Sequence, residues 1–232
     1  MGEIGMVSPV FEGGASKLMV PPAKANARAA STLRELKKLY PNAHCELVFK
    51  NPLELLVATI LSAQCTDKRV NLVTKGLFKK YRSARDYAEA EPCEIEAAIR
   101  SAGFYRAKAR SIREMAAALV GDFGGQVPRR MEDLLRLRGV ARKTANVVLG
   151  TAFGLAAGIV VDTHVKRLSF RLGLSNEEAP EKIEKDLMRL LPRKEWIFFG
   201  HAMIWHGRRL CQARNPHCPA CPMRSFCPRR GL

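Results

Sequence analysis

Apolar residues recur along this chain at intervals of about three or four positions, the spacing of helices that bury one face. The segment after Asn51-Pro52, LELLVATILSAQ, is strongly apolar, and we expect it to be buried on most sides. Thr66 or Asp67 can cap the next helix. Sustained period-two alternation, which marks strands, is missing, so the pattern predicts an all-α protein. Further helices are expected at about 83–90, 92–101, 105–120, 142–153, 179–191 and 194–210.

The N-terminal residues do not follow this pattern. Residues 1–27 mix Gly, Ala, Pro and Lys without apolar periodicity, which predicts a flexible basic tail. From Ala29 the sequence STLRELKKLYP predicts a short amphipathic helix that Pro41 stops.

The charge balance narrows the choice of partner. Lys and Arg number 39 against 22 Asp and Glu, which gives a net charge of +17. Such a field favours polyanions, either nucleic acid or an anionic membrane surface. No apolar run approaches the roughly 18 residues of a membrane span, and the N-terminus lacks the features of a signal peptide. We therefore expect a cytoplasmic protein, nucleoid-associated in a bacterium, that binds nucleic acid and no membrane.

The stretch from Leu137 to His164 holds the candidate chemistry. It predicts a tight hairpin at Gly139-Val140-Ala141, a helix with Lys143 near its start, and a second helix that Asp162 can cap. A hairpin followed by a helix N-terminus offers backbone N–H groups to a phosphate. Lys143 and the carboxylate of Asp162 stand nineteen residues apart beside this hairpin. The combination suggests amine chemistry on DNA.

A cluster of cysteines near the C-terminus predicts a metal centre. Four cysteines, Cys211, Cys218, Cys221 and Cys227, fall within seventeen residues, enough for one four-ligand site. Zinc is a common occupant of four-cysteine sites, and a [4Fe–4S] cluster also takes four thiolates. Only Cys218 and Cys221, which have two residues between them, resemble a zinc-ribbon knuckle, so the spacing favours iron–sulfur without deciding the question. The first cysteine loop could position Arg214 against a phosphate.

Four short motifs precede these cysteines in the chain, and the five features together carry a resemblance. The motifs are Leu61-Ser62-Ala63-Gln64-x-Thr66-Asp67, Gly103-Phe104-Tyr105-x-x-Lys108-Ala109, Gly139-Val140-Ala141-Arg142-Lys143-Thr144-Ala145-Asn146-Val147-Val148 and Val161-Asp162-Thr163-His164. In this order they resemble the endonuclease III family of helix-hairpin-helix DNA glycosylases, over about residues 28–228. The resemblance implies that the four cysteines hold a [4Fe–4S] cluster.

The resemblance also implies a reaction. The neutral amine of Lys143 would attack C1′ of a damaged nucleotide, displace the base and form a Schiff base, after which elimination breaks the 3′ phosphodiester bond. Asp162 would stabilise the developing positive charge or take part in activating the nucleophile. The expected enzyme is a DNA N-glycosylase and abasic-site lyase of base excision repair. It would act as a monomer on oxidised pyrimidines or abasic sites in double-stranded DNA.

The DNA contacts follow from the same resemblance. Gln64 would fill the gap left by a flipped nucleotide, and the loop Phe104-Tyr105-Arg106 would form a second wedge against the opposite strand. Ordinary core packing is an alternative for Phe104 and Tyr105. The hairpin contacts would come from Arg138, Gly139, Ala141 and Arg142.

The hairpin departs from the family pattern Leu-Pro-Gly-Val-Gly. Arg138 replaces the proline and Ala141 the second glycine. Alanine keeps its N–H donor, but a left-handed backbone at this position would cost about 1–2 kcal/mol.

The expected architecture has two helical domains with the active site in the cleft between them. Residues 46–157 would form a six-helix barrel domain with the helix-hairpin-helix motif, and 28–45 plus 158–232 the iron–sulfur domain. Lys143 and Asp162 would then face each other across the cleft. Two other functions stay open: a monofunctional mismatch glycosylase and a non-catalytic iron–sulfur sensor that binds DNA. A sensor needs neither Lys143 nor Asp162.

Overall fold

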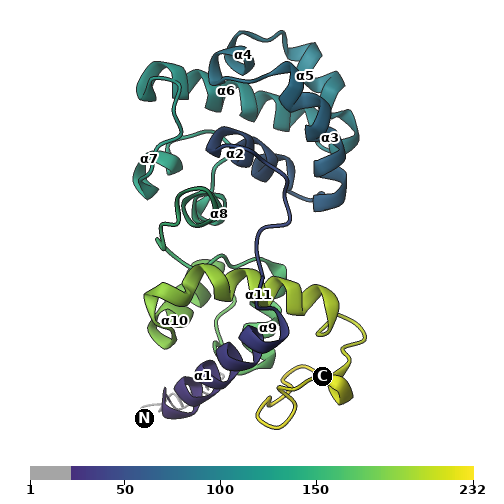
Figure 1. Cartoon of the computed structure of the whole chain (residues 1–232), viewed down its shortest axis with the longest axis vertical. Coiled ribbons are helices and arrows are strands. Elements are labelled where there is room, and N and C mark those ends of the chain that lie inside the picture. The colour runs from purple at the N-terminus through teal and green to yellow at the C-terminus, as the bar shows by residue number, and fades with distance from the viewer. Residues whose placement is uncertain (1–21) are drawn as a thin grey trace, which may run out of the picture.

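The computed structural model describes residues 22–232. Within this range the chain forms eleven α-helices and three short 3-10 helices and contains no strand, which confirms the all-α prediction. The helices fall into an upper and a lower group, joined by two crossings of the chain at 40–51 and 154–162 (Figure 1). The α-helices are α1 Pro22–Leu39, α2 Pro52–Leu61, α3 Asp67–Lys80, α4 Ala84–Glu89, α5 Pro92–Ile99, α6 Tyr105–Phe123, α7 Met131–Leu135, α8 Arg142–Phe153, α9 Thr163–Arg171, α10 Pro180–Leu190 and α11 Trp196–Arg209.

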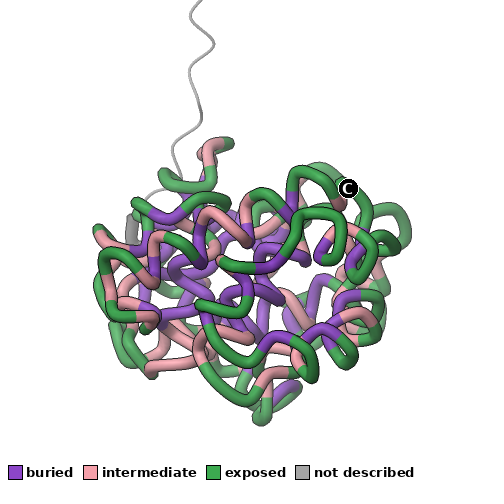
Figure 2. The backbone as a smooth tube through the Cα atoms, turned by 90° about the horizontal axis from the view of Figure 1, so that it is seen from above, coloured by how far each residue is buried: buried purple, intermediate pink, exposed green. Residues whose placement is uncertain are grey.

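Each group has its own hydrophobic core. The upper core draws on α2 to α8, with Leu55, Ile95 and Ile112 fully buried. The lower core joins α1 to α9, α10 and α11 and includes Leu36 and Phe199. Figure 2 shows buried residues concentrated in the interior and exposed residues around the rim. The two crossings contribute to both cores: Leu47 and Val160 belong to the upper core, and Tyr40, Ile159 and Val161 to the lower one.

Local capping signals set several helix limits. The Asn51 side chain accepts from the Glu54 N–H at 2.9 Å, and Pro52 opens the buried helix α2 as its pattern indicates. Of the two predicted caps for α3, Thr66 is the one used. Asp162 caps α9 through the Val165 N–H at 2.8 Å.

The start of the first helix corrects the predicted tail. Helix α1 begins at Pro22, so residues 22–27, which the composition placed in the flexible tail, are helical. Ala25 is buried, which shows that this segment contributes to packing despite its weak periodicity. The rest of the predicted tail, 1–21, lies outside the described residues. None of the helices in the described part is both long and apolar enough to cross a membrane.

Candidate active site

The predicted hairpin forms directly before α8. The Val140 N–H donates to the Leu137 carbonyl at 3.1 Å, and Gly139 has φ +79°. A Cβ at Gly139 would also lie 2.9 Å from the Cβ of Ser111 on α6. The position therefore needs glycine for its left-handed backbone and for the close approach of the hairpin to α6.

Ala141 does not carry the strain considered for it. Its backbone is extended, with φ −92° and ψ 170°, and it stands at the N-cap of α8. No side chain caps the N–H groups of this helix. Unpaired N–H groups at a helix start are suited to bind an anion such as a phosphate.

Lys143 and Asp162 line one pocket between the two helix groups. Lys143 is exposed in the first turn of α8, and Asp162 is half-buried at the start of α9. The capping bond to Val165 engages Oδ1 of Asp162 and so fixes the orientation of the carboxylate. The structure thus brings the lysine of the upper group and the acid of the lower group to the same cavity.

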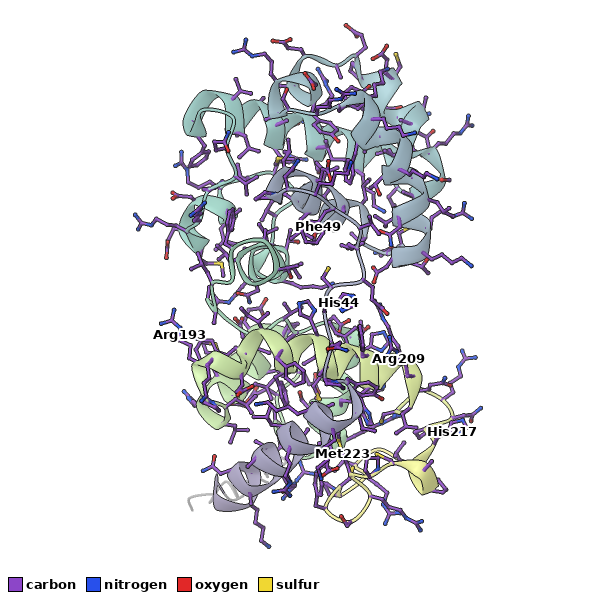
Figure 3. All side chains as sticks on the ribbon, in the orientation of Figure 1. His44, Phe49, Arg193, Arg209, His217 and Met223 are labelled. Atoms are coloured by element: carbon purple, nitrogen blue, oxygen red, sulfur yellow. The ribbon has the colours of Figure 1, made fainter. Side chains whose placement is uncertain are left out.

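The other walls of this pocket come from both groups and from the 40–51 crossing, where His44 is labelled in Figure 3. They include an ionic network that the sequence did not reveal. Arg208 on α11 donates to Asp67 at 2.8 Å and also contacts Glu46, which receives a second bond from Arg209 at 3.2 Å. The network joins the lower group to the start of α3. The sequence indicates Asp67 as a possible helix cap and as part of the first motif, but it does not predict these ion pairs.

The two predicted wedges adopt unusual backbone conformations. Gln64 has φ +52° and is exposed, three residues after the end of α2. Phe104 has φ +48° and is 67% exposed, so the alternative of core packing is wrong for this residue. Tyr105, by contrast, is partly buried against the upper core. Arg106 is exposed beside it, with its guanidinium 5.6 Å from the Tyr105 ring centroid.

The predicted basic contacts have different surroundings. Arg138 is half-exposed and lies 3.6 Å from Glu114 on α6. Arg142 is paired with Glu184 on α10, a contact that the sequence did not predict. Arg214 is exposed, in a loop whose preceding carbonyls, those of Gln212 and Ala213, both accept bonds of 2.7 Å from Arg171.

His164 packs beside the site. Its Nδ1 lies 3.2 Å from an Arg167 nitrogen, and burial lowers the pKa of the imidazole. Arg167 also donates to the carbonyls of Gly207 and Cys211, both at 3.0 Å.

The four C-terminal cysteines line a single cavity. Arg171 donates to the sulfur of Cys211 at 3.4 Å, and His206 Nε2 lies 3.8 Å from the sulfur of Cys221. Burial, and after it the neighbouring thiols, raise the pKa values of Cys221 and Cys227, so several thiolates in this cavity need a cationic centre. The described residues nowhere bring three His, Cys, Asp or Glu side chains close enough to hold a single metal ion. The donor set, four cysteine sulfurs around one cavity, suits a thiolate-bound metal centre.

Comparison with known proteins identifies the family. Residues 57–193 match the model of the HhH-GPD superfamily base excision DNA repair proteins. The chain is 53% identical to endonuclease III of Synechocystis over 92% of this chain and 97% of that protein, and 46% identical to endonuclease III of Bacillus subtilis over 84% and 89%. A solved structure of a trapped endonuclease III–DNA covalent intermediate is similar, with TM-score 0.84 and 48% identity over 88% of this chain and 96% of that one. The chain therefore belongs to the endonuclease III family of base excision repair glycosylases.

Proposed function

We propose that Lys143 and Asp162 are the catalytic pair of this enzyme, a bifunctional DNA glycosylase and abasic-site lyase of base excision repair. The observation that carries the proposal is their shared pocket between the two helix groups. Oxidised pyrimidines in double-stranded DNA are the proposed substrates. We further propose that the enzyme acts as a monomer, associated with DNA in the cytoplasm.

The proposed reaction uses the lysine twice. The neutral amine of Lys143 attacks C1′, the bond from C1′ to the base breaks, and the base leaves with the bonding electrons and takes up a proton. Opening of the sugar gives a Schiff base between Lys143 and C1′. The imine acidifies the C2′ proton, whose removal expels the 3′ phosphate by breaking the C3′–O bond.

Asp162 assists by its charge. A carboxylate in a pocket partly shielded from water stabilises the positive charge that develops at C1′ as the base departs. The hydrogen bond from the Val165 N–H holds the Asp162 carboxylate in place before the substrate binds. The carboxylate therefore needs little reorganisation during the reaction.

DNA must present the nucleotide outside the helix for this reaction. Gln64 and Phe104, both exposed, would enter the duplex where the nucleotide has left, and Arg106 would contact the opposite strand. The N–H groups at the start of α8, with Gly139 and Arg138 in front of them, would hold a phosphate.

The four cysteines are the proposed ligands of a [4Fe–4S] cluster. Such a cluster supplies structural bonds that tie together the C-terminal loop, and takes no part in bond breaking. Arg171 and the cysteines would together position the loop that presents Arg214 to a phosphate. Iron and sulfide analysis of the protein purified under reducing, anaerobic conditions tests this assignment. Equal amounts of iron and sulfide support it, and stoichiometric zinc would overturn it.

Trapping with borohydride tests the catalytic proposal. Reduction of the Schiff base should join the enzyme covalently to abasic DNA, and Lys143→Gln should form no adduct while it still binds the DNA. Lys166→Gln, which removes an exposed lysine from α9, serves as the matched control and should form the adduct. An undiminished adduct with Lys143→Gln would exclude this lysine as the nucleophile.

A further inference from the structure

Lys108 is a buried lysine that the proposed reaction does not use. It lies on α6 with 6% of its surface exposed, although lysine side chains are almost never fully buried unless paired. Its Nζ donates to two backbone carbonyls, those of Leu61 and Ala102, each at 2.8 Å. Ammonium groups near helix C-termini are stabilised by the carbonyl groups that the helix leaves unpaired.

The two carbonyls lie where the chain leaves a helix and enters a wedge loop. The two wedge loops are residues 62–64, which lead to Gln64, and residues 103–104, which lead to Phe104. Leu61 is the last residue of α2, and the chain reaches Gln64 three residues later. Ala102 ends the 3-10 helix at 100–102, and the chain reaches Phe104 two residues later. One ammonium group therefore binds both loops where they leave their helices.

Both loops are strained at the residue that would enter DNA. Apart from glycines, the described residues contain three positive φ angles, at Gln64, Phe104 and Arg229. Non-glycine residues keep this conformation only where the surrounding structure enforces it, and such residues cluster at functional sites. Gln64 and Phe104 are exposed, so their own side chains supply little of that enforcement.

We propose that Lys108 is a positioning residue that couples the two wedge loops, so that Gln64 and Phe104 enter the duplex in a fixed relation to each other. This proposal rests on the proposed function, because the wedge roles are part of it. Lysine suits the task because its three donors sit on a flexible apolar stem that can reach two loops from a helix.

The variant Lys108→Met tests the coupling, since methionine keeps an apolar stem and removes the donors. Removal of the base from lesion-containing duplex should fall about 100-fold, the loss typical of a misplaced group that does no chemistry itself. Strand cleavage of a single-stranded abasic oligonucleotide should stay close to the wild-type rate, because no nucleotide has to leave a duplex. A 2-aminopurine opposite the lesion should show weaker unstacking with the variant than with the wild type.

Two further variants separate coupling from loss of charge. Arg110→Met removes a positive charge from an exposed position of the same helix and should retain duplex activity. Lys108→Arg keeps the donors and should recover part of the duplex activity. The double variant Gln64→Ala/Phe104→Ala should reproduce the pattern of Lys108→Met, with loss on duplex only.

Three outcomes would overturn the proposal. If Lys108→Met removes the base from duplex DNA as fast as the wild type does, the two loops need no coupling. An equal loss on single-stranded and duplex substrates shows a general structural role. Wild-type duplex activity in the Gln64→Ala/Phe104→Ala variant shows that there are no wedges to position. In each case borohydride trapping of the wild type and of Lys143→Gln still reports separately on the catalytic role of Lys143.

Discussion

Arg142 and Glu184 form a two-point ion pair between helices α8 and α10. Arg142 Nε lies 2.6 Å from Glu184 Oε2, and Nη2 lies 3.2 Å from Oε1. Glu184 is 3% exposed and also accepts from Asn146 at 2.8 Å. A Cβ at Gly158 would lie 1.9 Å from its Oε1, so a side chain at this position would displace the Glu184 carboxylate. Because Arg142 directly precedes Lys143, the pair fixes the start of the lysine-bearing helix on the group that carries Asp162.

Replacement of Glu184 should destabilise the protein. Glu184→Ala leaves Arg142 and Asn146 without their shared acceptor. We expect the free energy of unfolding to fall by about 3 kcal/mol. This is the low end of the range for a broken buried ion pair, because the Arg142 side chain is partly exposed. Glu181→Ala, at an exposed position of the same helix, is the control and should cost far less. Urea denaturation of the variants measures both values, and equal stability of the two would contradict the role assigned to the pair.

Asp162→Asn should separate the capping role of this residue from its chemical role. Asparagine caps helices as well as aspartate does, so the thermal midpoint should stay near that of the wild type. The lost charge should slow base release by about 100- to 1000-fold, the loss typical of an electrostatic group in an active site. Asp162→Ala should lose about 1 kcal/mol of stability as well. Single-turnover kinetics and thermal unfolding check the two effects, and a fast Asp162→Asn enzyme would exclude a catalytic charge.

The two small residues of the hairpin should differ in how much a substitution costs. Gly139→Ala places a methyl group in a left-handed backbone and against Ser111, and should destabilise the protein by more than about 1–2 kcal/mol. Ala141→Gly restores the family residue at an extended position and should leave DNA affinity unchanged, with at most about 1 kcal/mol lost to the freer unfolded chain. Fluorescence anisotropy with abasic duplex measures the affinities. Tighter binding by Ala141→Gly would show that the alanine does weaken the anchor.

The sequence predicted those helix limits that depend on residues close together in the chain. Asn51-Pro52, Thr66 and Asp162 signal helix starts because a cap bonds to N–H groups two or three positions away. The predicted end of the helix at about 142–153 is equally local, since the next residue, Gly154, caps α8 with φ +66°.

Long-range pairing could not be predicted. Arg142 lies 42 positions before Glu184, and nothing in either helix pattern distinguishes that glutamate from a solvated one. The contact of Arg208 with Asp67 spans 141 positions and depends on how α11 crosses the pocket. Phe104 shows a different limit: an apolar residue in a short loop has no periodicity, so its exposure follows only from the folded chain.

A buried histidine in the active-site pocket should make stability depend on pH. His201 lines the pocket with 8% exposure, and burial lowers its pKa from 6.5 to about 4. Below pH 6.5 His201 becomes protonated in the unfolded chain, whereas in the folded chain it stays neutral until about pH 4. The stability present above pH 6.5 is therefore lost as the pH falls toward 4, by up to about 3 kcal/mol at 1.36 kcal/mol per pKa unit.

Replacement of His201 should make the stability of the protein depend less on pH. His201→Gln keeps a polar group within reach of Thr151, which lies 3.3 Å from His201 Nε2, and removes the titration. Urea denaturation at pH 7 and pH 4.5 should show a smaller loss of stability in the variant than in the wild type. His206, whose pKa burial also lowers to about 4, remains in both proteins, so its contribution cancels in the comparison. An unchanged difference between the two pH values would mean that His201 gains its proton in the folded state as easily as in the unfolded chain.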